Sequence, residues 1–278
     1  MIVACRKGQT QMSKFPGMWV SESGKLAYRV LPKCACSTIG QVIYYGDNGE
    51  YFDGDIHDAD DGMLKWDQDH NQDRIRDTVE AQAAFSFTCV RNPYSRILSA
   101  FFDKICGIQR NGKTYRGNLV PMLNKRYGVE TEGDFDQIAS FRRFLVFVRD
   151  TIRFRKPMVP DIHWIAMSNH LGFSINNGFE VNYIFATENF NDGMKHVLAQ
   201  APLEHDINID EMPRFNESEG HGPKRAHPVE DYFDDLSIFL MHDIYKKDFQ
   251  LFKYDRAPGR GGPKKEIDVD EVKARLTK

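Results

Sequence analysis

Apolar residues fall into short runs that alternate with segments of helical spacing. Leu26 to Leu31 has the length of a short strand, and Ala84 to Val90 and Val181 to Thr187 are typical of buried parallel strands. The period of the apolar positions predicts helices over Thr38 to Tyr45, Pro93 to Ile105, Asp136 to Arg149, Asn189 to Gln200 and Val229 to Phe252. Strands alternating with helices predict an α/β fold, a single domain with a central parallel sheet flanked by helices.

A polar loop joins the first strand to its helix. Pro32 ends the strand, and Lys33, Ser37 and Thr38 follow. A helix N-terminus leaves backbone N–H groups unpaired and carries a partial positive charge, so it attracts anions, and Lys33 adds a mobile cation. The glycines of a G-x-x-x-x-G-K-[ST] loop are absent, which argues against an ordinary ATPase or kinase. Taken alone, these residues fit an anion site or an ordinary helix start with an exposed lysine.

The second strand also runs into a helix through a polar joint. Asn92 has the chemistry of an N-cap, and Pro93 suits the first helical position. Arg91 can make forked contacts to a phosphate, and Ser99 can donate to the same group. The alternative is a strand–helix joint with an arginine salt bridge. Ligand loops lie at the carboxyl ends of parallel strands, so the two loops are predicted to hold both phosphate ends of one nucleotide.

In this order, the two segments resemble sulfotransferases that use 3′-phosphoadenosine 5′-phosphosulfate (PAPS). P-K-x-A-C-S-T at residues 32–38 is similar to their 5′-phosphosulfate loop. V-R-x-P-x-x-R-I-L-S-A-F-x-D-K at residues 90–104 is similar to the 3′-phosphate segment of the carbohydrate sulfotransferases, or sulfotransferase family 2. The resemblance implies a P-loop-nucleotide-kinase-like fold in a sulfotransferase domain over residues 1–255. Residues 256–278 are then expected to form a polar, mobile tail with a short helix near Asp268 to Leu276.

Three shorter matches follow in the family's order: D-x-H-W at residues 161–164, F-N-E-S at 215–218 and Y-x-x-D-F-x-L-F-x-Y at 245–254. Two departures concern the acceptor side. Golgi members of the family usually carry paired cysteines after H-W, where this chain has Ala166 to Gly172. They also usually have His-x-Asn-x-Ser, where this chain has Arg214-Phe215-Asn216. The resemblance therefore specifies the nucleotide more closely than the acceptor.

Carried over residue by residue, the resemblance assigns the donor site. Lys33, Cys36, Ser37 and Thr38 would bind the 5′-phosphosulfate, and Arg91 and Ser99 the 3′-phosphate. Sulfuryl transfer is an in-line displacement with charge developing on the leaving oxygen, which Lys33 would neutralise. PAPS chemistry needs no metal, so no metal site is expected.

The acceptor hydroxyl needs a general base, and nine histidines compete for this role. His163 is the first choice because Asp161 can orient it, provided that the backbone between them is not helical. The alternative is that His163 packs on Trp164 in the core. His70 is second, since related sulfotransferases often place their base between the two phosphate segments. His57, in an acidic stretch, is third.

Composition narrows the remaining functions. The net charge of −3 does not indicate nucleic-acid binding, and no apolar stretch reaches the length of a transmembrane segment. The start has no signal-peptide core, and five cysteines lack the spacing of a disulfide framework, so a cytoplasmic location is expected. Residues 107–156 hold eleven Lys/Arg against five Asp/Glu, which suggests either a solvated surface or a cationic wall for an anionic acceptor.

The sequence thus predicts a PAPS-dependent sulfotransferase that acts on a hydroxyl acceptor, most compatible with a carbohydrate. The alternative is a catalytically inactive nucleotide- or glycan-binding module on the same fold. A small-molecule kinase is disfavoured by the missing glycine loop. The pattern of residues fixes neither the acceptor nor the oligomeric state.

Overall fold

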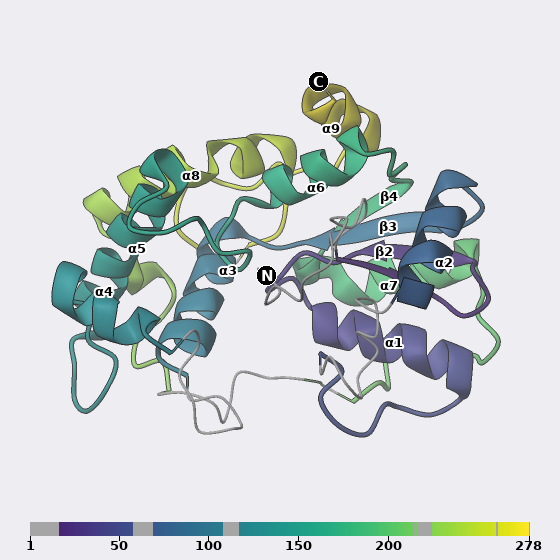
Figure 1. The fold of residues 1–278 in the computed structure, drawn as a ribbon, viewed down its shortest axis with the longest axis horizontal. Helices are drawn as coiled ribbons and strands as arrows, with labels where there is room; N and C mark the ends of the chain where they lie inside the picture. The colour runs from purple at the N-terminus through teal and green to yellow at the C-terminus, as the bar shows by residue number, and fades with distance from the viewer. Residues whose placement is uncertain are drawn as a thin grey trace.

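The computed structural model describes residues 17–57, 69–107, 117–213, 215, 224–259 and 261–277. They form one α/β domain around a four-stranded sheet with the strand order β1-β2-β3-β4 (Figure 1). Neighbouring strands β2, β3 and β4 are parallel, and β1 pairs antiparallel with β2 at the edge. The strands are β1 (Met18–Val20), β2 (Leu26–Arg29), β3 (Phe85–Val90) and β4 (Tyr183–Ala186). The predicted α/β fold class is confirmed.

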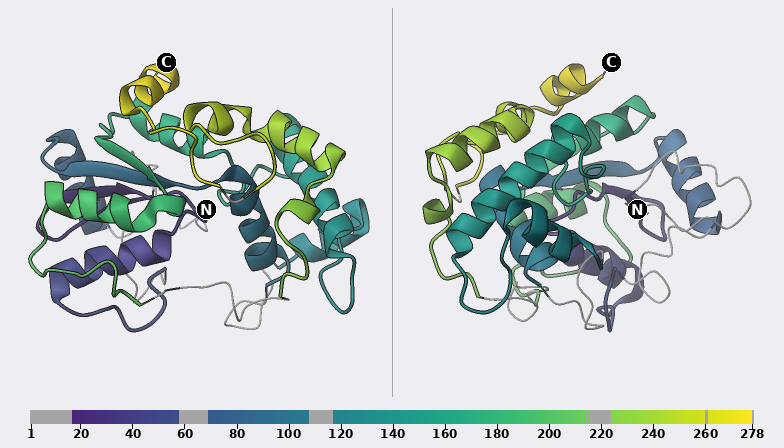
Figure 2. Two further views of the ribbon diagram at one scale, coloured as in Figure 1. Left: turned by 180° about the vertical axis from the view of Figure 1, so that it is seen from behind. Right: turned by 60° about the vertical axis from the view of Figure 1, so that its left-hand side comes forward.

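Helices cover both faces of this sheet (Figures 1 and 2). Helices α1 (Cys36–Asn48) and α7 (Phe190–Gln200) pack on one face, where Val42 and Met194 join Phe87 in one apolar cluster. The other face carries a larger core made with the helices α2 (Asp69–Glu80), α3 (Pro93–Ala100), α5 (Gln137–Phe154), α6 (Met167–Asn176) and α8 (Asp235–Leu251). Both faces are therefore apolar, which explains the continuous apolar runs in the parallel strands.

Shorter helical elements connect and extend these helices. Helix α4 (Leu119–Tyr127) packs on α5, and α5 packs along α8 at one end of the sheet (Figure 2). Helix α3 passes directly into the π-helical turn η2 (Phe101–Ile105). Two 3₁₀ turns are η3 (Thr187–Asn189) and η4 (Glu230–Tyr232). Among the helices of the described residues, none is both long and apolar enough to cross a bilayer.

The single helix predicted over Val229 to Phe252 is wrong. The Asp234 side chain accepts a hydrogen bond from the Ser237 backbone N at 2.9 Å, so it caps a new helix, α8, that begins at Asp235. The break changes the helical phase. A single helix from Val229 would place Leu236 and Phe239 on its apolar face, but they are 50% and 60% exposed.

The segment after residue 255 packs against the domain. The expected short helix is present as α9 (Val269–Leu276), which lies against α6 and buries Val272 and Leu276. The Asn176 amide donates to the carbonyl of Leu276 at 2.9 Å. This packing corrects the expectation of a free polar tail, because the segment buries apolar side chains of its own. The domain boundary at residue 255 stays a prediction.

Candidate functional site

The two loops singled out in the sequence lie side by side at the carboxyl ends of β2 and β3. The Arg91 guanidinium Nη1 donates to the backbone carbonyl of Lys33 at 3.2 Å. Arg91 follows β3 directly, and Lys33 lies in the loop between β2 and α1. Because β2 and β3 are neighbouring parallel strands, their following loops emerge at the same edge. The predicted juxtaposition of the two loops is confirmed.

The first loop has an unusual backbone. Lys33 and Ala35 have φ angles of 68° and 56°, in the left-handed region that residues other than glycine rarely adopt. Such residues cost of order 1–3 kcal/mol each and persist where their surroundings fix them, often at functional sites. One contact that fixes the loop comes from the buried Arg96, whose guanidinium Nε donates to the Pro32 carbonyl at 2.9 Å.

The helices that follow the two loops begin differently. The N-cap of α1 is Ala35, which has no side chain to accept from the first N–H groups of the helix. Asn92 caps α3 by accepting from the Tyr94 backbone N at 3.0 Å, and Pro93 occupies the first position, as predicted. The start of α1 therefore lacks a side-chain cap, and a helix N-terminus is a place that suits an anion.

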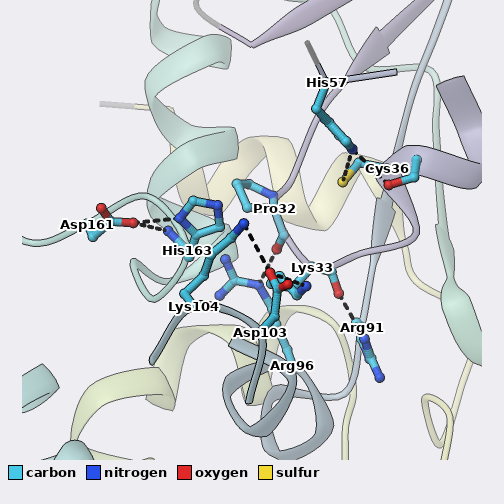
Figure 3. A network of polar contacts seen from close by, with 11 residues as sticks. Pro32, Lys33, Cys36, His57, Arg91, Arg96, Asp103, Lys104, Asp161 and His163 are labelled. Carbon is cyan, nitrogen blue, oxygen red and sulfur yellow. Dashed lines mark hydrogen bonds and ion pairs between the residues drawn. The ribbon is translucent and has the colours of Figure 1, made fainter. Parts of the chain in front are cut away.

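Two lysines share one carboxylate beside the first loop (Figure 3). The Asp103 Oδ2 lies 3.0 Å from the Lys33 Nζ and 3.1 Å from the Lys104 Nζ. Burial alone would raise the pKa of Asp103, but the two ammonium groups outweigh it and lower the pKa to about 2. Asp103 is therefore ionised at neutral pH, and the three groups together carry one positive charge.

Arg91 is held at the start of α3. Its Nε donates to the Ser95 hydroxyl at 3.1 Å, and Ser95 in turn donates to the Asn92 carbonyl at 3.1 Å. Burial lowers the pKa of Arg91. Ser99 lies one turn further along α3 and is half-buried, and within the described residues its hydroxyl has no hydrogen bond. Arg91 thus precedes α3 and Ser99 is the seventh residue of that helix, so both predicted phosphate ligands come from one strand–helix segment.

His163 is bonded to the carboxylate that was expected to orient it. The His163 Nδ1 and backbone N lie 2.7 Å and 3.0 Å from the Asp161 Oδ1, across a non-helical turn. Burial lowers the pKa of His163 against the opposing effect of Asp161, and Lys104 and Lys33 lower it further. Trp164 is fully buried against Phe144 and Phe147, whereas the His163 side chain is 16% exposed. Trp164, and not His163, is therefore the residue of this pair that packs in the core.

The late Y-x-x-D-F match has a structural role in placing this segment. The Tyr245 hydroxyl donates to the Trp164 carbonyl at 2.8 Å. The buried Asp248 carboxylate accepts from the backbone N of Met167 and of Ser168, both at 2.8 Å. Because these donors open helix α6, Asp248 ties α8 to the turn that carries His163. Burial raises the pKa of Asp248.

His57 contributes to the first loop, which the sequence reasoning missed. Its Nε2 lies 3.8 Å from the Cys36 sulfur (Figure 3). The same nitrogen lies 2.8 Å from the Ser37 hydroxyl. Burial alone would lower the pKa of His57, but Cys36 and Asp55 raise it above its ordinary value. Burial alone would raise the pKa of Cys36, but His57 and Lys33 lower it to about 7. No local motif marks His57, because the contact depends on the path of the chain after α1.

Within the described residues, three arginines of the basic stretch are paired with acidic side chains. Arg149 Nε lies 2.9 Å from the Asp243 carboxylate on α8, which also pairs with Arg153. Arg142 pairs with Asp234. These three arginines therefore bind α8 or its N-cap residue, and the cationic wall for an anionic acceptor stays a prediction.

The remaining predicted site residues are placed as follows. Thr38 is half-buried in the first turn of α1. His70 is the second residue of α2, and its side chain lies outside the described part of the structure. Residues 216–218 of the F-N-E-S match also lie outside it. The described residues contain no cluster of three or more histidine, cysteine or acidic side chains suited to a metal ion.

Comparison with known proteins shows the family to which the chain belongs. The model of a family described as "Sulfotransferase family" matches residues 16–255, so the chain belongs to this family. Carbohydrate sulfotransferase 10 of Xenopus laevis is 26% identical over 180 residues, which cover 61% of this chain and 47% of that protein. The chain thus spans about half the length of the curated relative it matches. No solved structure matches significantly.

The environment of Cys36 predicts selective reactivity with iodoacetamide. At pH 8, a thiol with a pKa of about 7 is mostly thiolate, whereas burial raises the pKa of Cys34 and Cys106 to about 12. The thiolate is the nucleophile, so Cys36 should be labelled at least about 100 times faster than these two. Peptide mapping by mass spectrometry measures the rates.

The pH dependence provides the control. Labelling of Cys36 should decline as the pH falls below 7, and His57→Leu should move this decline to higher pH. Equal labelling of Cys34 and Cys36, or an unchanged profile in His57→Leu, would contradict the described contact.

Proposed function

We propose that this protein transfers a sulfuryl group from PAPS to a hydroxyl, most compatible with a hydroxyl of a carbohydrate. The observation that carries the proposal is the contact of Arg91 with the Lys33 carbonyl, since it brings two cationic loops to one edge of the sheet. Membership of the sulfotransferase family supports sulfuryl transfer. The carbohydrate acceptor is proposed from the name of the matched relative.

The donor would span the two loops. Its 5′-phosphosulfate would meet the N-terminus of α1 together with Lys33, Cys36, Ser37 and Thr38. Its 3′-phosphate would meet the forked donors of Arg91 and the hydroxyl of Ser99. The fit rests on the charge of these groups: the Lys33–Asp103–Lys104 trio has a surplus positive charge, and the start of α1 has no side-chain cap.

Catalysis would rest on electrostatic stabilisation and on proton transfer. The acceptor oxygen forms a bond to sulfur while the bond from sulfur to the bridging phosphate oxygen breaks, so negative charge develops on that bridge. Lys33 would leave Asp103 partly or fully to neutralise this charge. The role of Asp103 before transfer would be to hold the Lys33 ammonium near the loop.

His163 would act as the general base. Donation from Nδ1–H to Asp161 selects the tautomer with its lone pair on Nε2, which would take the proton of the acceptor hydroxyl. Burial lowers the pKa of His163, so the imidazole is neutral near pH 7, as a base must be. His70 stays the second candidate.

A binding module without turnover is the rival function. The altered acceptor-side motifs favour this function. The ion pair of Lys33 with the ionised Asp103 argues against it, because the chain retains a charged donor site. Incubation with labelled PAPS and a panel of acceptors separates the two, since only the enzyme transfers label. The cytoplasmic location stays a prediction.

Arg91→Ala should weaken binding of 3′-phosphoadenosine 5′-phosphate by about 10–100-fold, because one charge-assisted contact contributes about 1.5–3 kcal/mol. Binding of adenosine 5′-phosphate, which lacks the 3′-phosphate, should hardly change. Titration calorimetry measures both constants. Arg275→Ala, in α9, is a matched control that should bind both nucleotides as the native protein does. Unchanged binding of 3′-phosphoadenosine 5′-phosphate by Arg91→Ala would contradict the assignment.

His163→Ala should lower kcat for sulfuryl transfer by about 10²–10⁴-fold and leave nucleotide affinity unchanged, because the base acts on the acceptor. In the native protein, activity should fall at acid pH because His163 becomes protonated. The residual activity of His163→Ala should not show this fall. His196→Ala is the control: His196 packs on Phe85 and Tyr183 at the amino ends of the strands, away from the site. Full activity of His163→Ala would contradict the assignment of His163 as the general base and leave His70 as the candidate.

A further inference from the structure

A hollow of about 730 Å³ lies on the surface where α4 and α5 pack together at one end of the molecule (Figure 1). This volume is within the range of about 300–1,000 Å³ that is typical of sites for small molecules. The residues that line it come from α4, from the C-terminal turns of α5 and from the segment after α5: Arg126, Tyr127, Asp150, Phe154, Lys156 and Pro157. The hollow shares no residue with the proposed donor site.

The hollow lies near the turn that carries the proposed base. Tyr127 packs on Phe147 with ring centroids 5.5 Å apart, and Phe147 packs on Trp164 at 5.9 Å. One phenylalanine ring therefore separates the wall of the hollow from the residue that follows His163. The segment that lines the hollow after α5 also leads directly into this turn.

Aromatic side chains give the hollow apolar surfaces on which a sugar ring can stack. Phe154 is 58% exposed, whereas Phe144 and Phe147 of the same helix are buried. The Tyr127 hydroxyl donates to the Asp150 Oδ2 at 3.0 Å, which holds the tyrosine ring in place. Apolar and aromatic walls with a few fixed polar groups are usual in ligand sites.

Two cations set the charge of the hollow. Arg126 and Lys156 are exposed, and within the described part of the chain neither forms an ion pair with a carboxylate. Asp150 opposes them, but its carboxylate already accepts from Tyr127. Two cations and one carboxylate leave one net positive charge, which favours an anionic ligand. A guanidinium suits a carboxylate in particular, because the two can form parallel hydrogen bonds.

We propose that this hollow is a subsite for the acceptor, which binds an acidic sugar unit with its ring against Phe154 and its carboxylate at Arg126 and Lys156. This inference rests on the proposed function, since it names a class of acceptor for the same reaction. The substrate is then an oligosaccharide that contains a uronic acid or a similar acidic unit, and one of its hydroxyls reaches His163.

Titration calorimetry with two oligosaccharides tests the inference on the full chain without nucleotide. One is a tetrasaccharide of hyaluronan, which alternates glucuronic acid with N-acetylglucosamine. The other is the same tetrasaccharide with its carboxylates reduced to alcohols. The acidic form should bind at least about 10-fold more tightly, because the reduced form cannot make the charge-assisted contacts.

Variants of exposed residues locate the binding. Arg126→Gln and Lys156→Gln should each weaken the acidic form about 10-fold and leave the reduced form unchanged. Phe154→Ala should weaken both forms, because stacking does not depend on the carboxylate. Lys125→Gln is the matched control: Lys125 is the exposed neighbour of Arg126 on α4 and does not line the hollow, so this variant should bind both forms as the native protein does.

Three outcomes would overturn the inference: equal affinity for the two forms, native affinity in Arg126→Gln, or equal losses in Lys125→Gln and Arg126→Gln. The last result would mean that the oligosaccharide is attracted to any cation of this surface. Failure of the native protein to bind 3′-phosphoadenosine 5′-phosphate would instead contradict the proposed function. Because the oligosaccharides are titrated without nucleotide, the two failures are distinguishable.

Discussion

The site depends on the buried guanidinium of Arg96. It is only 1% exposed, and its Nε and Nη1 donate to the carbonyls of Pro32 and Ile165, both at 2.9 Å. A buried arginine must find acceptors, because an unpaired buried charge is costly. Arg96 finds them in two backbone segments far apart in the sequence. Helix α3 thereby fixes both the loop with Lys33 and the turn that precedes α6, and each predicted role of a side chain presupposes this arrangement.

Charges around this scaffold divide the candidate site into two functional parts. On the donor side, Lys33, Lys104 and Arg91 place positive charge near the first loop, with Asp103 holding the two lysines. On the acceptor side, burial keeps His163 neutral while Asp161 orients it. The positive groups that suit an anionic donor also help to keep the nearby histidine neutral, so one arrangement of charge serves both proposed roles.

The sequence predicted the parts of the fold and of the site that depend on neighbouring residues. The Asn92 cap, the first-turn Pro93 and the Asp161–His163 contact are local, and each was predicted correctly. The contacts of His57 with Ser37 and of Asp103 with Lys33 were not predicted, because they join segments 20 and 70 residues apart whose approach depends on the tertiary fold. The break before α8 was missed because the apolar positions keep a helical period through Asp234. The Asp234 side chain accepts from the Ser237 backbone N and so starts a new helix within that period.

The central claim is that two cationic loops bind the two ends of one 3′-phosphorylated nucleotide. Nucleotide-dependent thermal unfolding tests it most directly, since a ligand that binds only the folded state raises Tm. We predict that 3′-phosphoadenosine 5′-phosphate raises Tm by several degrees at a concentration about 100 times its Kd, and that ATP at the same concentration does not. An unchanged Tm with 3′-phosphoadenosine 5′-phosphate, or an equal rise with ATP, would contradict the account.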